Sequence, residues 1–539
     1  MKIGIFMAYG PQTVLGKEGL GRYIGNLVKG FTDVQQEVIM AVPKWSTDTI
    51  SELFEDFGVS ESSVSFAVLE RIPAIWGAYS ILKGRKKKKK TARKYRVLRK
   101  AVDWAELFAG AMLNITNLAV LGLVMLLLCV VGVVLLPFAL VGAVVYVVLS
   151  FLKSRLKKGE FKLKDTFWKL LQVTKRLSKT GLGLDEYIYT RMMNHVTEML
   201  VQKANRQDVD VWFVPALFWP ETKGLKKVRV ITVPDVVTKE FPLLCANMPR
   251  ITEQTKKCVD TIENGEYFIT YCDYVRQSLL EHRFGKYHGV TIEHPDNELN
   301  SLIAIDASYE RKLNARKNFT DAFARGVLRS LPPHTVYGQD MLVDYSFENT
   351  RYIFYASQAR PYKNILNLIK AYEELLRKRY VDVKLFLTCD LTRDAAAYQY
   401  VMSHHLQFDV ICFYNISAQQ LAALYRCADL VVNPTLYEGG FPFTLGEGMS
   451  VGTPSLMSDI PQVRDVVEKY GLEDTMLFDP YDWMRMADKI EYALQHREEL
   501  YQKQLGMYQH FAARSNEVVA KEYIAAFEHF INEDRKKRA

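Results

Sequence analysis

One stretch decides how this chain is read: NPTLYEGGFPFTLGEGMSVGTP, residues 433–454. The apolar run Leu430–Val432 before it predicts a buried strand, and its glycines predict a turn. A short helix is expected next, to about Val451, with Pro442 at the first helical position, where the missing N–H costs nothing. A strand, a glycine turn and a helix start form an anion site, because free N–H groups and the helix dipole point into one cleft.

Two carboxylates flank this turn, Glu438 before it and Glu447 inside the expected helix. A carboxylate near a bound phosphate is unfavourable unless it accepts hydrogen bonds from hydroxyl groups. The combination therefore suggests a ligand with phosphate and polyol parts, such as a nucleotide sugar. Physical chemistry alone leaves a second interpretation equally open, in which the stretch is a glycine–proline loop with two solvated glutamates.

The stretch resembles the donor-site signature of the family 4 (group 1) retaining glycosyltransferases, which have the GT-B fold. The family pattern is a glutamate, a glycine–phenylalanine turn, a proline, and a second glutamate that heads Ala-Met-x-x-Gly-Thr-Pro. Residues 447–454, EGMSVGTP, match the second part. The gap between Glu438 and Glu447 is one residue longer than in the family.

Length and charge indicate how the chain is organised. At 539 residues it is too long for one core, so two domains and an insertion are expected. The net charge of +9 is concentrated between Lys83 and Lys179, which indicates a local partner. The seven cysteines form no CxxC pair, which favours reduced thiols over a disulfide frame or a zinc site. The short apolar run at residues 3–7 reads as a buried strand and not as a signal peptide.

The N-terminal segment predicts the start of a Rossmann-like domain. Strands are expected at Ile3–Met7 and Val38–Val42, with a glycine-spaced loop and then a helix at about Arg22–Phe31 between them. The loop segment with Gly19, Gly21 and Arg22 resembles the first loop of family 4 enzymes, which lies across the cleft from the donor phosphates. An ordinary flexible loop is the alternative.

A later strand, Val228–Val233, carries a departure from the family. In the family, the corresponding strand ends in a His-Asp pair at the cleft, whereas this chain has Pro234 and Asp235. A proline offers neither a proton nor a hydrogen bond, so any role of that histidine is lost or taken elsewhere. Asp235 is retained as a cleft residue, with a helix-capping aspartate as the alternative.

The second domain is expected to start with a strand at Arg351–Ala356, followed by a turn with Arg360 and Lys363. Two cations at a strand-to-helix turn suit a diphosphate. The family places an arginine and a lysine here for that purpose. Lys363 matches the lysine, and Arg360 stands two residues after the usual arginine position, with a solvated arginine as the alternative. The loop with Tyr414 and Asn415 resembles the family's base-binding loop.

An insertion interrupts the first domain. No charged residue occurs from Ala109 to Leu152, and basic tracts flank this run. A bilayer core of about 30 Å takes roughly 20 helical residues, so the run suffices for two spans. Basic residues on both sides favour a hairpin with both ends in the cytoplasm, bound to anionic lipids. A re-entrant hairpin, a buried helix pair and a nucleic-acid site for the basic tract are the alternatives, and no nucleic-acid partner is expected.

These observations predict an α/β chain with the GT-B fold, in which two Rossmann-like domains face each other across a cleft. The expected parts are the first domain at 1–82 and 181–296, a basic insertion at 83–180 with a hairpin at about 109–152, an interdomain region at 297–350, the second domain at 351–515, and a helix at 516–539 that crosses back to the first domain.

The resemblance implies a retaining hexosyltransferase that uses a nucleoside-diphosphate sugar and no cofactor or metal. Its implied catalytic residues are Arg360, Lys363 and Glu438. The implied donor-binding residues are Glu447, which would hold ribose hydroxyls, and Gly439, Gly440, Phe441, Thr444, Leu445, Tyr414 and Asn415. The acceptor would be a glycan or a lipid-linked intermediate at the cytoplasmic face of the inner membrane. A catalytically weak GT-B membrane scaffold and a GT-B phosphorylase are the alternatives.

Overall fold

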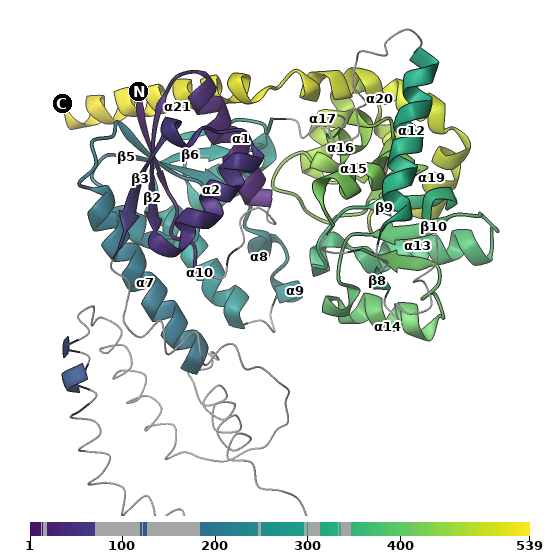
Figure 1. The fold of residues 1–539 in the computed structure, drawn as a ribbon, viewed down its shortest axis with the longest axis horizontal. Coiled ribbons are helices and arrows are strands. Elements are labelled where there is room, and N and C mark those ends of the chain that lie inside the picture. The colour runs from purple at the N-terminus through teal and green to yellow at the C-terminus, as the bar shows by residue number, and fades with distance from the viewer. Residues whose placement is uncertain are drawn as a thin grey trace, which may run out of the picture.

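The computed structural model describes residues 1–11, 13, 19–70, 119–120, 122–124, 126, 184–245, 249–295, 299, 313–331, 334–335, 347–413 and 416–539. These residues form two α/β domains that lie side by side, each built around one sheet (Figure 1). The α/β class and the two parallel-sheet domains that the sequence predicts are confirmed.

The first sheet is parallel throughout, with the strand order β3-β2-β1-β4-β5-β6-β7. Its strands are β1 (Lys2–Phe6), β2 (Glu37–Pro43), β3 (Val64–Leu69), β4 (Val211–Val214), β5 (Val228–Val233), β6 (Tyr267–Thr270) and β7 (Gly289–Thr291). Strand β1 pairs with both β2 and β4, so segments before and after the insertion belong to one sheet, as the sequence predicts.

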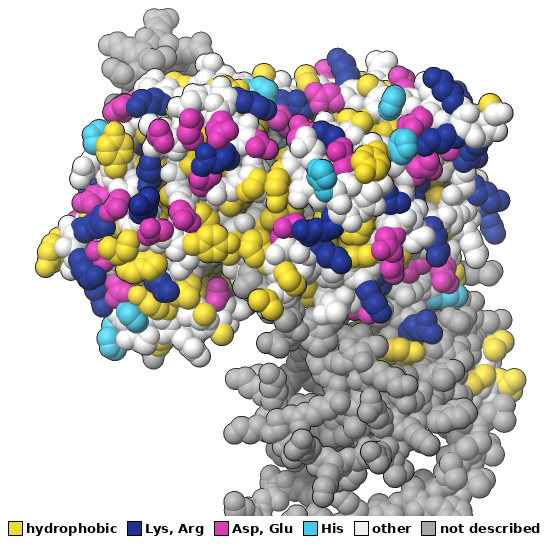
Figure 2. Space-filling view, turned by 180° about the vertical axis from the view of Figure 1, so that it is seen from behind, with side chains coloured by type: hydrophobic (Ala, Val, Ile, Leu, Met, Phe, Trp, Pro, Cys, Tyr) yellow, Lys and Arg dark blue, Asp and Glu magenta, His cyan; other side chains and the backbone are white. Residues whose placement is uncertain are grey.

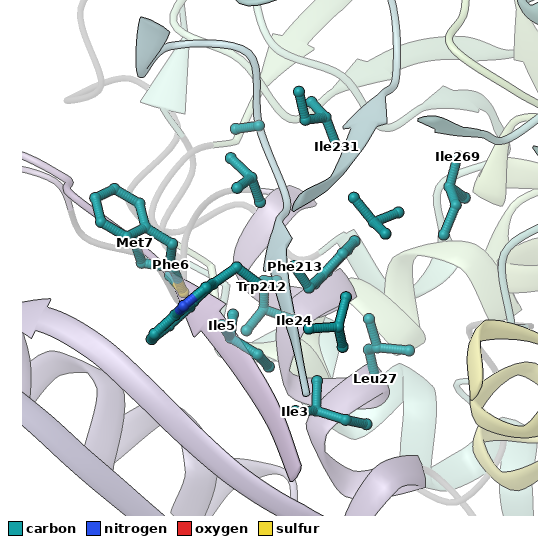
Figure 3. Packing of buried hydrophobic residues seen from close by; sticks show 14 of the residues in the cluster. Ile3, Ile5, Phe6, Met7, Ile24, Leu27, Trp212, Phe213, Ile231 and Ile269 are labelled. Atoms are coloured by element: carbon teal, nitrogen blue, oxygen red, sulfur yellow. The ribbon is translucent and has the colours of Figure 1, made fainter. Parts of the chain in front are cut away.

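Apolar side chains on both faces of this sheet form its core (Figure 3). Ile3, Ile5 and Phe213 are fully buried, as expected for parallel strands that are covered on both faces. Gly4 lets the ring of Trp212 lie close to β1, because a β-carbon at residue 4 would come within 2.5 Å of that ring. The central strands therefore pack in one specific arrangement.

Helices and short helical turns surround the first sheet. They are α1 (Gly19–Asp33), η2 (Lys44–Ser46), α2 (Thr47–Asp56), η3 (Glu61–Ser63), α7 (Leu184–Ala204), η4 (Pro220–Gly224), α8 (Val237–Glu240), α9 (Pro242–Cys245), α10 (Pro249–Glu263) and the π-helix η5 (Val275–Arg283). Helix α1 begins before the predicted Arg22, so Gly19 and Gly21 lie in its first turn and not in a loop. Leu20 packs against the core, which extends the apolar face of the helix toward its N-terminus.

The second sheet has the strand order β14-β13-β12-β9-β10-β11-β8. Its strands are β8 (His334–Thr335), β9 (Tyr352–Tyr355), β10 (Lys384–Leu387), β11 (Val410–Cys412), β12 (Leu430–Asn433), β13 (Ser455–Ser458) and β14 (Leu477–Phe478). All pairs are parallel except β8 with β11.

The second domain starts earlier than the sequence predicts. Its helical elements are α12 (Leu313–Arg329), η8 (Phe347–Asn349), η9 (Pro361–Lys363), α13 (Ile365–Arg377), η10 (Leu391–Arg393), α14 (Ala395–Ser403), α15 (Ala418–Cys427), α16 (Phe443–Ser450), α17 (Pro461–Val467), η11 (Glu468–Tyr470), α18 (Glu473–Met476) and α19 (Trp483–Gln495). The region 297–350 was expected to be irregular, yet α12 buries Ala324 and Leu328, one helical turn apart, in the core with Leu424. Residues 313–331 therefore belong to this domain.

The sequence predicts two closing helices, at about Trp483–Gln495 and Asn516–Asn532. The structure has a third between them, because α20 (Arg497–Ala512) precedes α21 (Asn516–Arg538). The buried face of α20 includes a polar residue, which weakens the helical pattern in the sequence. Gln504 is fully buried and forms hydrogen bonds with the backbone of Ser455. Helix α21 runs along the first domain (Figure 1). Tyr523 and Phe527 of this helix belong to the core of that domain. The C-terminal helix crosses back as expected.

The predicted hairpin at about 109–152 lies outside the described residues, apart from 119–120, 122–124 and 126. Among the helices that the structure describes, none has the length and apolar character that a bilayer crossing requires. Figure 2 shows one face of the molecule, where charged side chains of both signs are interspersed and hydrophobic side chains gather toward the middle.

Candidate active site

The turn after β12 is held by its own asparagine. The side chain of Asn433 donates to the hydroxyl of Thr444 at 3.1 Å and accepts from the backbone N–H of Thr435 at 3.2 Å, so it spans the turn. Helix α16 begins at Phe443, and Pro442 is the extended residue before it, with φ −65° and ψ 134°. The prediction that Pro442 occupies the first helical position is therefore wrong by one residue, and the free N–H groups begin at Phe443.

Two of the predicted donor-binding residues, Phe441 and Leu445, pack their side chains against the interior of the second domain. Leu445 is fully buried in a cluster with Met449 and Val463. Phe441 stacks on Phe511, with the ring centroids 4.7 Å apart. Their side chains pack within the protein, so backbone groups are what these positions can offer to a ligand at the turn.

Glu447 is buried, with 5% of its surface exposed, and both carboxylate oxygens are hydrogen-bonded. Arg22 donates from Nη1 to Oε1 at 3.0 Å, and the hydroxyl of Tyr425 donates to Oε2 at 2.5 Å. The ion pair joins the first turn of α1 to α16 across the cleft. Burial, and then the charge of Glu447, raise the pKa of Tyr425, so this phenol stays a neutral donor.

The second carboxylate, Glu438, forms an ion pair with Lys363. The turn that carries Lys363 is fastened to the turn after β12 by Asn364, which donates from Nδ2 to the carbonyl oxygens of Pro434 at 2.9 Å and Pro480 at 2.7 Å. Asn364 has a left-handed backbone, with φ 56°. The structure thus brings together two residues that lie 75 positions apart in the sequence.

Arg360 lies at the exposed rim of the same turn. Its Nη1 donates to the hydroxyl of Tyr362 at 2.8 Å. The structure therefore joins Lys363 directly to Glu438 and leaves Arg360 where solvent reaches it.

Two glycines allow the two domains to touch at this turn. A β-carbon on Gly439 would lie 2.5 Å from the carbonyl oxygen of Pro234, and one on Gly440 would lie 2.8 Å from Cβ of Tyr271. The thiol of Cys272 also donates to the carbonyl of Gly439 at 3.5 Å. The double glycine is required here by close backbone contact, since any side chain would push the domains apart.

Asp235 lies beside the same turn on the first domain. Its Oδ1 accepts a long hydrogen bond of 3.4 Å from the N–H of Val237, at the start of α8, and Oδ2 lies 3.5 Å from the β-carbon position of Gly439. The N-cap residue of α8 is Val236, with no side-chain cap hydrogen bond, so Asp235 lies one residue before the cap. Its role as a cleft residue stays a prediction. Burial, and then Glu438, raise the pKa of Asp235, although Arg360 and Lys363 oppose the shift.

The site has features that attract an anion. The Arg22–Glu447 pair brings the N-terminal turns of α1 and α16 together, and each helix end attracts negative charge. Lys363 adds a cation beside them. Within the described ranges, no group of three histidine, cysteine or acidic side chains could hold a metal ion.

Most of the predicted site residues that the structure describes lie around this turn. Gly19 and Gly21 lie in the turn of α1 that bears Arg22. Tyr414 and Asn415 lie outside the described residues. Sequence reasoning missed Tyr425, Tyr271 and Cys272, none of which belongs to a local motif.

Comparisons with known proteins agree with this geometry. Residues 343–507 match the family model described as "Glycosyl transferases group 1", so the second domain carries a glycosyltransferase group 1 domain. No curated protein sequence matches the chain.

Solved structures of similar fold cover nearly the whole chain. Sucrose-phosphate synthase from Thermosynechococcus elongatus is 12% identical over 99% of each chain, with a TM-score of 0.55. Anabaena HepE in complex with UDP-glucose is 11% identical over 98% of this chain and 100% of its own, with a TM-score of 0.53. At such identities the likeness concerns the fold, which is that of a GT-B glycosyltransferase.

Proposed function

We propose that this chain is a retaining glycosyltransferase that moves a sugar from a nucleoside-diphosphate sugar to an acceptor hydroxyl. The observation that carries the proposal is the joined constellation at the start of α16, with Lys363 on Glu438 and both Arg22 and Tyr425 on Glu447. All of these residues except Arg22 lie in the part of the chain that matches the glycosyltransferase family model. Because HepE is a structure with UDP and with UDP-glucose, UDP-sugars are the first donors to test.

Glu447 would bind the ribose of the donor. An ionised carboxylate has about four acceptor positions. Arg22 and Tyr425 take two of them and fix the orientation of the group. On donor binding the carboxylate would accept from ribose hydroxyls, and a hydrogen bond to a charged group contributes about 1.5–3 kcal/mol.

Lys363 would stabilise the leaving diphosphate. On donor binding it would exchange Glu438 for a phosphate oxygen, since one ammonium group can serve either partner. The backbone N–H groups at the start of α16 and the exposed Arg360 would add to this stabilisation, which is aimed at charge that develops on the leaving group. No metal ion is called upon in this scheme.

Glu438, released from Lys363, would face the donor sugar. The bond between the anomeric carbon and the diphosphate oxygen breaks, and the acceptor oxygen bonds to the same face of that carbon. The acceptor proton passes to the departing phosphate. Retention of configuration comes from the family resemblance of residues 433–454.

The membrane part of the proposal rests on the uncharged run Ala109–Leu152 and its basic flanks. Since β3 and β4 belong to one sheet, the chain must leave and return on the same side of a bilayer. We expect the run to hold the cleft near a lipid-linked acceptor at the cytoplasmic face. The full chain should float with anionic vesicles at high salt, and arginine at both Val124 and Val144 should release it. Flotation unchanged by these two charges would contradict the anchor.

The donor proposal is tested by thermal unfolding with a panel of UDP-, GDP- and ADP-sugars. A true donor at 100 times its dissociation constant stabilises the protein by about 2.7 kcal/mol. Glu447→Gln should lose most of this stabilisation, whereas Glu499→Gln, an exposed control that pairs with Lys503, should keep it. If no nucleotide sugar of the panel stabilises the wild type, the donor proposal is wrong.

A further inference from the structure

A histidine at the domain boundary has no part in the donor site described above. His294 follows β7 in the first domain, and its ring meets three aromatic rings from other elements. The centroid distances are 3.9 Å to Tyr271 after β6, 4.7 Å to Phe443 in α16 and 6.0 Å to Tyr23 in α1. Phe443 belongs to the second domain, so the imidazole lies in an aromatic stack that crosses the cleft.

The same ring lies against the donor turn. A β-carbon on Gly440 would lie 3.6 Å from Nε2 of His294. His294 also lines a cavity of about 30 Å³ at the start of α16, together with Phe441 and Pro442. Gly439, the preceding residue of the turn, meets Pro234. The turn is thus held by the first domain at two consecutive residues.

Packing, more than hydrogen bonding, fixes this imidazole. Its Nδ1 is buried and has no hydrogen-bond partner among the residues that the structure describes. A phenyl ring would fill the same stack without leaving a buried polar atom unpaired. The property that histidine adds to this position is its ability to take up a proton.

We propose that His294 is a positioning residue that holds the Gly439–Gly440 turn, and through it Glu438, against the first domain when the cleft is closed. This inference rests on the proposed function, because Glu438 is assigned there to the donor sugar. It gives the first domain a second contact with the turn, beside the Pro234 contact.

The position makes closure dependent on pH. Burial, and then the charge of Arg514, lower the pKa of His294 from 6.5 to about 3. The titratable and charged groups around it are Arg514, Glu293, His510, Tyr271, Tyr23 and Cys272. The closed cleft needs the neutral ring, so closure is favoured above pH 6.5 and weakens as the pH falls below it. At pH 5.5 the ratio of closed to open forms should fall about tenfold.

Two substitutions separate the effect of the aromatic ring from the effect of its protonation. Sugar transfer is followed at pH 7.5 and 5.5 as release of nucleoside diphosphate from the nucleotide sugar that stabilises the chain most. His294→Ala removes the stack and should lower kcat/KM about tenfold at pH 7.5. His294→Phe keeps the aromatic contacts, so its kcat/KM should match that of the wild type at pH 7.5. At pH 5.5 the wild type should lose a further tenfold in kcat/KM, and the phenylalanine variant should not. Identical pH profiles for the wild type and the phenylalanine variant, or equal losses for both variants at pH 7.5, would overturn the inference.

A second measurement does not depend on activity. Spin labels at Asp208→Cys and Arg393→Cys, both exposed and in different domains, report the distance between the domains in the full chain. The unsubstituted chain, labelled in parallel, accounts for the native cysteines. When the pH is lowered from 7.5 to 5.5, the distance between the labels should increase in the chain with the native His294. It should stay constant in the chain that carries His294→Phe. A distance that does not change with pH in the chain with His294 would overturn the role of this residue. The absence of sugar transfer by the wild type would instead overturn the proposed function.

Discussion

In the second domain the cleft is lined by a charged, hydrogen-bonded turn, and in the first domain it is lined by a mainly aromatic surface. The turn lies within one contiguous stretch, residues 433–454, and carries Glu438 and Glu447 with Lys363 fastened beside it. The aromatic surface combines Tyr23, Tyr271 and His294 from separate parts of the chain. Arg22 is the cation that this surface extends to Glu447.

The difference suggests a division of labour between the two surfaces. The charged turn can stabilise a leaving group with groups of its own domain, because the Lys363–Glu438 pair and the start of α16 both belong to the second domain. The aromatic surface offers shape, closure and the exclusion of water. Substitutions in the charged turn should therefore affect the chemical step most, and substitutions in the aromatic surface should affect closure.

The largest effect is expected from Lys363→Met. Loss of the cation removes stabilisation of the leaving diphosphate, which should lower kcat about 100- to 1000-fold. Release of nucleoside diphosphate from the stabilising donor measures this change. Lys378→Met, at the end of α13 and 70% exposed, is the matched control and should leave kcat unchanged. Equal rates for wild type and Lys363→Met would show that the charged turn does not perform the chemistry.

A smaller loss, about 10- to 100-fold in kcat/KM, is expected from Gly439→Ala. The new methyl group would lie 2.5 Å from the carbonyl oxygen of Pro234, so the domains could not close on the turn. Gly506→Ala is the control, because it lies within α20 with no atom within 4 Å of the added carbon. That control should raise stability by about 0.5–1 kcal/mol at unchanged activity. Full activity of Gly439→Ala would mean that close contact of the domains is not needed.

Arg22→Ala should lower kcat/KM at least about tenfold, since one hydrogen bond to a charged group contributes about 1.5–3 kcal/mol. The substitution removes the cation that the first domain supplies to Glu447 and keeps the hydrogen bond from Tyr425. Steady-state kinetics and calorimetric binding of the donor measure the loss. Arg485→Ala, 81% exposed, serves as the control. If the donor binds the Arg22→Ala variant with unchanged affinity, the Arg22–Glu447 pair contributes nothing to donor binding.

The smallest effect is expected from Asp235→Asn, and it concerns stability. Burial and Glu438 raise the pKa of Asp235, so the folded state favours the neutral carboxyl group. The stability that the aspartate contributes is then greatest at low pH and is lost as the pH rises from its unfolded pKa through its folded one. The variant should therefore gain in Tm relative to the wild type between pH 4 and pH 8. A gain that does not vary with pH would contradict the raised pKa.

The same two surfaces show what could be predicted from the sequence. Glu438, Glu447 and Lys363 stand in local patterns, so the charged turn could be predicted as a site before its geometry was seen. Tyr425 was missed because it lies in the last turn of α15, where an aromatic residue is expected to belong to the core. The contact between Glu447 and Arg22 spans 425 positions and arises only when two domains meet.

The aromatic surface could not be predicted, because the sheet order assembles it. Strands β1, β5, β6 and β7 lie in one parallel sheet, and the segments that follow them meet at one edge. Nothing in the sequence around His294 marks it as a neighbour of Gly440. Helices α12 and α20 were also missed, and the buried face of α20 includes the polar Gln504.

Hydrogen–deuterium exchange of the full chain, with and without the nucleotide sugar that stabilises it most, tests the central claim most directly. We expect the donor to bind between the two surfaces, so amide exchange should slow both in residues 434–450 and in residues 19–33. Protection confined to one of these segments, or found only elsewhere in the chain, would contradict a donor site in this cleft.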